Sequence, residues 1–158
     1  MKTKNIFLSV IIAAFLSSSI PYGSHSLEIG SEAPSLVLSS KSSADLAPLK
    51  GNKVLLNFWS ASDAGSRMAN RFISDAAESG KYPDTRFVSV CIDSDSALAA
   101  QIRKADRISG KVISLNSDEI SNDVMEDFQT SKGCRSFLID SFGNLEAIAP
   151  SAAVSSMI

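Results

Sequence analysis

Histidine is nearly absent from this chain of 158 residues, because His25 is its only one. That residue lies in an N-terminal segment that we expect to be removed, so the mature domain would carry no imidazole. Imidazole is the commonest general base and the commonest metal ligand in proteins. The sequence therefore argues against histidine-dependent hydrolysis and against copper or zinc sites, and we expect no metal and no cofactor.

Basic clusters are missing as well. The chain has 15 Lys and Arg residues against 17 Asp and Glu residues, and no stretch interleaves basic with aromatic side chains. Nucleic-acid binding needs a basic surface that neutralises phosphates. We therefore expect no nucleic-acid partner.

A hydrophobic run long enough to span a membrane is also lacking. The apolar run from Ile6 to Leu16 is shorter than the about 20 residues that a membrane-spanning helix needs. Lys2 and Lys4 precede this run, and small polar residues follow it up to Ser26. This order is typical of a secretory signal peptide, which we predict over residues 1–26.

Cleavage is expected near Ser26, with Ser19 as the alternative, and leaves one domain over residues 27–158. No cysteine directly follows the apolar run, which argues against a lipid anchor. We therefore expect an exported protein that does not contact the membrane after cleavage.

Two apolar runs predict the centre of a sheet. Val54 to Trp59 is almost continuously apolar, as in a strand buried on both faces, and Arg86 to Ile92 is a second such strand. Between them, apolar residues from Met68 to Ala77 repeat at helical spacing, and Ser79 and Gly80 end this helix.

The rest of the domain alternates strands and helices, which predicts an α/β fold with a mixed sheet covered on both faces. Leu98, Ile102 and Ala105 are expected to share the inward face of one helix. The further predicted elements are a strand at Leu36 to Leu38, a helix over Ala97 to Ala105 capped by Asp95 or Ser96, a strand over Lys111 to Leu115, a helix over Ser121 to Gln129, hairpin strands over Ser136 to Asp140 and Leu145 to Ala149, and a short closing helix over Ser151 to Ile158.

Three segments in order carry a resemblance to a known family. They are Glu28 to Pro34 at the domain entry, Val54 to Trp59, and Phe137 to Asp140 followed by Gly143. With them the domain resembles the thioredoxin-like superfamily, in particular exported thiol–disulfide oxidoreductases of the TlpA/ResA type and the related AhpC/TSA peroxiredoxins. The resemblance implies a thioredoxin-like three-layer α/β/α sandwich with a mixed central sheet, and it implies a periplasmic location.

The family's redox motif is missing from its expected place. In the family, Phe-Trp at the strand end is followed by Cys-x-x-Cys, and the resemblance puts Asp63 and Ser66 at the two cysteine positions. Dithiol exchange needs an attacking thiolate and a second thiol. Asp63 cannot form a disulfide, and we expect it to be the N-cap of the following helix instead. Ser66 is no nucleophile without a base.

A second departure concerns the loop before the strand at 136–140. The family carries a cis-proline there, whereas residues 132–136 of this chain contain none, so we expect a trans peptide and an altered substrate groove.

The two cysteines, Cys91 and Cys134, are expected on opposite sides of the central strand. Two strand spacings of about 4.8 Å exceed the about 7 Å that a disulfide allows between Cα atoms, so we predict no direct bridge. We expect Cys91 to be a small residue of the hydrophobic core. Cys134 lies beside Lys132 and Arg135, whose charges would favour a thiolate, and is the candidate catalytic residue, with an inert thiol as the alternative.

Three residues flank the expected site. Arg67 and Arg135 could form a small positive patch, paired with Asp63, or an ordinary solvated ion pair. Trp59 flanks the same face, although sheet-end packing is the simpler interpretation.

The leading hypothesis is a non-redox or redox-impaired thioredoxin-like domain, monomeric, that binds an unknown protein or peptide partner where the active site used to be. A thiol–disulfide oxidoreductase acting through Cys134 alone is the alternative, so whether the protein is an enzyme stays open. A decayed paralogue is a third hypothesis.

Overall fold

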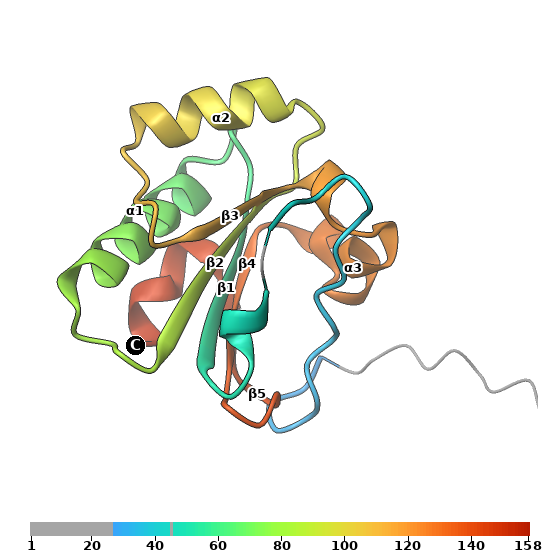
Figure 1. Cartoon of the computed structure of the whole chain (residues 1–158), viewed down its shortest axis with the longest axis vertical. Helices are drawn as coiled ribbons and strands as arrows, with labels where there is room; N and C mark the ends of the chain where they lie inside the picture. The colour runs from blue at the N-terminus through green and yellow to red at the C-terminus, as the bar shows by residue number, and fades with distance from the viewer. Residues whose placement is uncertain (1–26, 45) are drawn as a thin grey trace, which may run out of the picture.

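A five-stranded mixed sheet forms the centre of the computed structural model, which describes residues 27–44 and 46–158. The strand order is β3-β2-β1-β4-β5 (Figure 1). The predicted signal peptide over residues 1–26 lies outside the described residues. The strands are β1 (Lys53–Trp59), β2 (Thr85–Cys91), β3 (Ile113–Asn116), β4 (Arg135–Ile139) and β5 (Leu145–Pro150).

The central strand β1 pairs in parallel with β2 and antiparallel with β4. It is buried from Val54 to Trp59, which confirms the predicted two-sided strand. The strands β4 and β5 form the predicted antiparallel hairpin, with Ser136 opposite Ala149. The mixed sheet predicted from the sequence is therefore confirmed.

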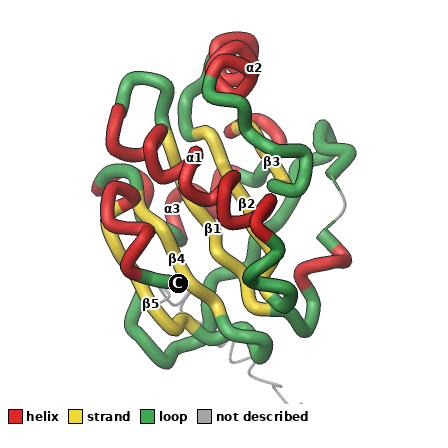
Figure 2. Tube along the Cα trace, turned by 90° about the vertical axis from the view of Figure 1, so that its left-hand side faces the viewer, coloured by secondary structure: helices red, strands yellow, loops and turns green. Residues whose placement is uncertain are grey.

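Helices cover both faces of the sheet. Among the described residues the helices are α1 (Ala64–Ser79), α2 (Ser96–Ala105), α3 (Asn122–Asp127) and four short 3₁₀ helices, η1 (Ala47–Leu49), η2 (Ser117–Glu119), η3 (Thr130–Lys132) and η4 (Ser151–Ser156). On one face, α1 and η4 pack on Leu55, Phe87 and Leu138. Figure 2 shows α1 lying across this face. On the other face, Val124 of α3 and Phe128 just after this helix pack on Leu56 and Phe58 together with the N-terminal segment, which completes three layers.

Two predicted features are wrong. The strand at Leu36 to Leu38 does not form, because Leu38 makes only an isolated bridge with Ile120, which belongs to a connecting segment without strand neighbours. The inward face of α2 is also different. Ile102 packs near Trp59 as predicted, but the residue that α2 buries fully is Ala99, whereas Leu98 is 41% exposed and Ala105 is exposed.

Within residues 27–44 and 46–158, no helix combines the length and the apolar composition needed to cross a membrane.

Candidate functional site

The candidate site begins where β1 ends and α1 starts. Asp63 is the N-cap of α1, as predicted, and its Oδ1 accepts a hydrogen bond from the backbone N–H of Ser66 at 2.5 Å. The hydroxyl of Ser66 donates to the carbonyl oxygen of Asp63 at 3.1 Å and accepts from the backbone N–H of Ser60 at 3.2 Å. Asp63 is exposed, whereas Ser66 is fully buried. At the start of α1, therefore, the carboxylate of Asp63 faces solvent and the hydroxyl of Ser66 does not.

Asp93 holds the loop between β1 and α1 from the neighbouring strand end. Its Oδ1 accepts from the Ser60 hydroxyl at 2.9 Å and its Oδ2 accepts from the backbone N–H of Ala61 at 2.6 Å. Sequence reasoning missed this residue. The available signal was a polar residue just after the buried strand β2, because parallel neighbours such as β1 and β2 end at the same edge of a sheet.

Cys134 lies opposite the start of α1, half-buried, within hydrogen-bond reach of the Ser66 hydroxyl. Burial raises the pKa of the Cys134 thiol, the hydrogen bond with Ser66 offsets part of this rise, and the nearby carboxylates of Asp63 and Asp93 add to it. The expectation that Lys132 and Arg135 favour a thiolate is therefore wrong. The thiol is less ionised at neutral pH than a free cysteine.

The basic neighbours of Cys134 are engaged elsewhere. The ammonium of Lys132 donates to the side-chain oxygen of Gln129 at 2.7 Å. The guanidinium of Arg135 lies over the ring of Phe137, 5.6 Å from its centre. Neither charge is directed at the sulfur atom.

Arg67 does not join Arg135 or Asp63 either. Its guanidinium makes a two-pronged ion pair with Asp106 at the end of α2, with Nε to Oδ2 at 3.0 Å and Nη2 to Oδ1 at 2.8 Å. Of the two alternatives given for Arg67, the structure shows an ordinary ion pair rather than a patch with Arg135, and its partner is Asp106, so Arg67 links two helices.

Trp59 is completely buried, so it cannot line an exposed binding face as the sequence analysis allowed. It packs with Cys91 and Ala99 beneath the start of α2. Its indole N–H finds no hydrogen-bond partner among the described residues. The alternative interpretation, packing at the sheet end, is confirmed for Trp59.

Both cysteines are free, which confirms the prediction that they form no bridge. Their strands, β2 and β4, lie on opposite sides of β1. Burial raises the pKa of Cys91 to about 11. Every peptide bond of the described residues is trans, including those of the 132–136 loop, as expected. The described part of the chain brings no three His, Cys, Asp or Glu side chains together in a way that could hold a metal ion.

The chain was compared with protein families, with curated proteins and with solved structures. No family model and no curated protein matches the chain, whereas 123 chains of solved structures do. A thioredoxin-like protein from Parabacteroides distasonis matches with a TM-score of 0.62 and 21% identity, over 82% of this chain and 93% of that one. The fold is thioredoxin-like.

Two further solved structures illustrate the likeness. A putative thiol:disulfide interchange protein, DsbE, from Chlorobium tepidum matches with a TM-score of 0.65 and 21% identity, over 79% of this chain and 86% of that one. A secreted disulfide oxidoreductase from Mycobacterium tuberculosis matches with a TM-score of 0.57 and 15% identity, over 72% and 80% of the two chains. These likenesses establish the fold, and the chemistry is decided by the residues of this chain.

Proposed function

We propose that this protein is an exported thioredoxin-like domain with a degenerate active site, which binds a protein or peptide partner and does not exchange disulfides. The observation that carries this proposal is the first turn of α1, where the exposed Asp63 caps the helix and the buried Ser66 completes the turn. In the family that the chain resembles, this turn holds the two redox cysteines.

The remaining thiols are poorly suited to disulfide exchange. Exchange begins with attack by a thiolate, so a raised thiol pKa lowers the reactive fraction at neutral pH. Burial raises the pKa of both Cys91 and Cys134. The alternative function, an oxidoreductase acting through Cys134 alone, is therefore disfavoured.

The exposed groups of the site are suited to binding instead. Ser62 and Asp63 are exposed, and Cys134 lies half-buried beside them. A carboxylate in this position accepts hydrogen bonds from N–H donors of a peptide segment. The surrounding loops are held by Asp93 and by the Asp63 cap, which keeps the surface pre-organised and lowers the entropic cost of binding.

Export to the periplasm is part of the same proposal. It is supported by the basic and apolar segments at the N-terminus and by the secreted protein among the similar structures. We further propose that the mature domain acts as a monomer.

Insulin reduction with dithiothreitol as electron donor tests the absence of exchange. We expect the mature protein and its Cys134→Ser variant to leave the rate at the background level, because neither presents two reactive thiols. Turnover by the unmodified protein that disappears in Cys134→Ser would replace the binding function with the oxidoreductase alternative.

Site-specific photocrosslinking in the exporting cell tests the binding face. A benzophenone amino acid at Ser62, which is exposed beside Asp63, should give a discrete crosslinked product. The same amino acid at Glu126, which is exposed on α3 behind the sheet, is the control. Equal crosslinking at both positions, or none at Ser62, would contradict a partner at this face.

A further inference from the structure

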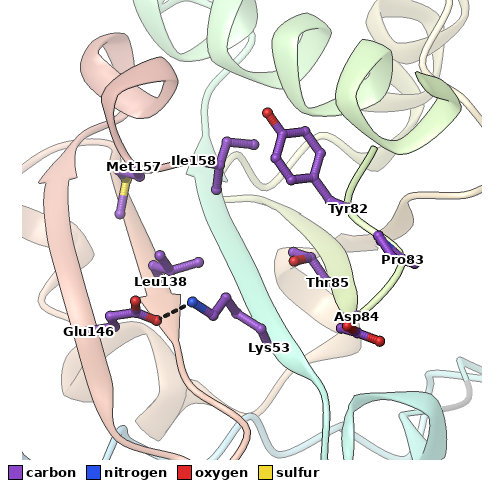
Figure 3. Close-up of a pocket in the computed structure, with 9 residues that line it drawn as sticks. All are labelled: Lys53, Tyr82, Pro83, Asp84, Thr85, Leu138, Glu146, Met157 and Ile158. Atoms are coloured by element: carbon purple, nitrogen blue, oxygen red, sulfur yellow. Dashed lines mark ion pairs between the residues drawn. The ribbon is translucent and has the colours of Figure 1, made fainter. Parts of the chain in front are cut away.

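A pocket of about 330 Å³ lies at the end of the sheet opposite the candidate site. It is bounded by the first residues of β1 and β2, by the loop after α1 and by the terminal residues after η4 (Figure 3). Its apolar wall is formed by Tyr82, Pro83, Leu138, Met157 and Ile158. This size lies at the lower end of the range for small-molecule sites.

A second pocket, of about 550 Å³, adjoins the first. The two share Lys53, Asp84 and Glu146, and the second adds Asp140 and Phe142. An apolar chamber and a polar chamber therefore meet at one set of charged side chains.

The shared region carries an excess of negative charge. The ammonium of Lys53 is already paired with Glu146 at 2.7 Å, as the dashed line in Figure 3 shows, which leaves Asp84 and Asp140 without an opposing cation in the pocket lining. The backbone N–H groups of Asn144 and Phe142 donate to Asp140 and hold the pKa of its carboxyl low. The carboxylate thus stays ionised well below neutral pH.

An exposed aromatic ring stands at the rim of the polar chamber. Phe142 is 90% exposed, which is unusual for a large apolar side chain. The face of such a ring attracts an organic cation. The aromatic ring at the rim and the carboxylates thus both favour a positively charged organic ligand.

We propose that the paired pockets bind a small amphipathic amine, with its apolar body against Leu138 and Met157 and its ammonium group among Asp84, Asp140 and Glu146. Burial of the apolar body would supply most of the binding free energy, and the excess of carboxylates would favour a positively charged head group over a negative one. This site is separate from the face proposed above and does not depend on it.

Titration of the mature protein with n-hexylamine, followed by ¹H–¹⁵N NMR, tests the proposal. Hexanoate and 1-hexanol, which share the apolar body, are the matched probes. We expect saturable shifts at the amides of Tyr82, Leu138 and Glu146, with the amine binding at least about fivefold tighter than hexanoate. Equal or tighter binding of hexanoate, or shifts outside the pocket lining, would overturn the proposal.

The variant Glu146→Gln tests whether the carboxylates select the amine or whether hydrophobic contact alone accounts for binding. It removes one carboxylate and frees the ammonium of Lys53, so the preference for the amine over hexanoate should fall at least about threefold. Glu146 is exposed, so this variant is expected to fold. The control is Glu126→Gln on α3, with the same charge change behind the sheet, which should keep the full preference. An unchanged preference in Glu146→Gln would refute the proposed head-group site.

Discussion

The single residue with the clearest structural role in the site is Asp63, which caps the first turn of α1. Its carboxylate accepts from the backbone N–H of Ser66, a group that would otherwise lack a partner in the helix. Replacing Asp63 by Ala should lower the free energy of unfolding by about 1 kcal/mol, measured by urea denaturation. Asp63→Asn, which keeps a capping oxygen, is the control and should retain most of the stability. An Ala variant as stable as the native protein would refute the capping role.

Cys134 allows a test of thiol reactivity. Because burial raises its pKa, the thiolate fraction at pH 7 is smaller than that of a free thiol. Iodoacetamide should alkylate Cys134 of the folded protein more slowly than it alkylates glutathione. The rate should go on rising at pH values where that of glutathione has levelled off. The Cys134→Ser variant measures the contribution of Cys91. Labelling faster than glutathione would contradict the environment described for Cys134.

Single residues differ in how far the sequence predicts them. The Asp63 cap was predictable because its partner lies three positions along the same chain segment. The partners of Arg67 and Cys134 were not, because Asp106 lies 39 positions from Arg67 and only folding brings Asp93 to Cys134. Charge next to a residue in sequence is therefore a poor guide to charge next to it in space.

Between the secondary-structure elements, a buried polar network ties α1 to the sheet. Asn70 of α1 accepts hydrogen bonds at its Oδ1 from the hydroxyl of Ser89 on β2, at 2.5 Å, and from the amide of Asn57 on β1, at 3.5 Å. The hydroxyl of Ser136 on β4 in turn donates to Asn57 at 2.8 Å. All four side chains are buried, so three strands and one helix share a single set of partners. This network fixes how α1 lies on the sheet.

The variant Asn70→Ala should therefore cost more than one ordinary hydrogen bond. It leaves the donors of Asn57 and Ser89 buried without their acceptor, which predicts a loss of about 2–4 kcal/mol in the free energy of unfolding. The neighbouring exposed residue is the control, and Arg71→Ala should change stability by less than about 0.5 kcal/mol. A loss no larger in Asn70→Ala than in Arg71→Ala would show that the network does not couple helix and sheet.

The predictability of each element follows the strength of its pattern. The runs that became β1 and β2 are mostly apolar and are buried on both faces, so no alternative competed with a central strand. Leu36 to Leu38 is just as apolar, but it lacks a strand beside it, and sheet pairing depends on a neighbour distant in sequence. In α2 the apolar residues lie on several sides of the helix, and the contact with Trp59 decides that Ala99 and Ile102 face inward.

At the scale of the whole molecule, the two proposed sites lie at opposite ends of the sheet. The candidate binding face lies at the end where β1 meets α1, and the paired pockets lie at the other end, around the first residue of β1. The thioredoxin-like fold was predictable because three segments carry its resemblance and the element order agrees with it. The pockets were not predictable, because they arise where the residues after η4, the α1–β2 loop and four strands meet.

The central claim is that Asp63 and Ser66 occupy the positions of a redox cysteine pair. The most direct measurement restores that pair, with Asp63→Cys and Ser66→Cys in a Cys134→Ser background, and compares insulin reduction with that of the single Cys134→Ser protein. A control with Asp123→Cys and Glu126→Cys places the same spacing on exposed positions of α3. The account predicts that only the first variant forms an internal disulfide and gains turnover. If that variant folds but keeps both thiols free and stays inactive, these two positions are not those of the redox pair.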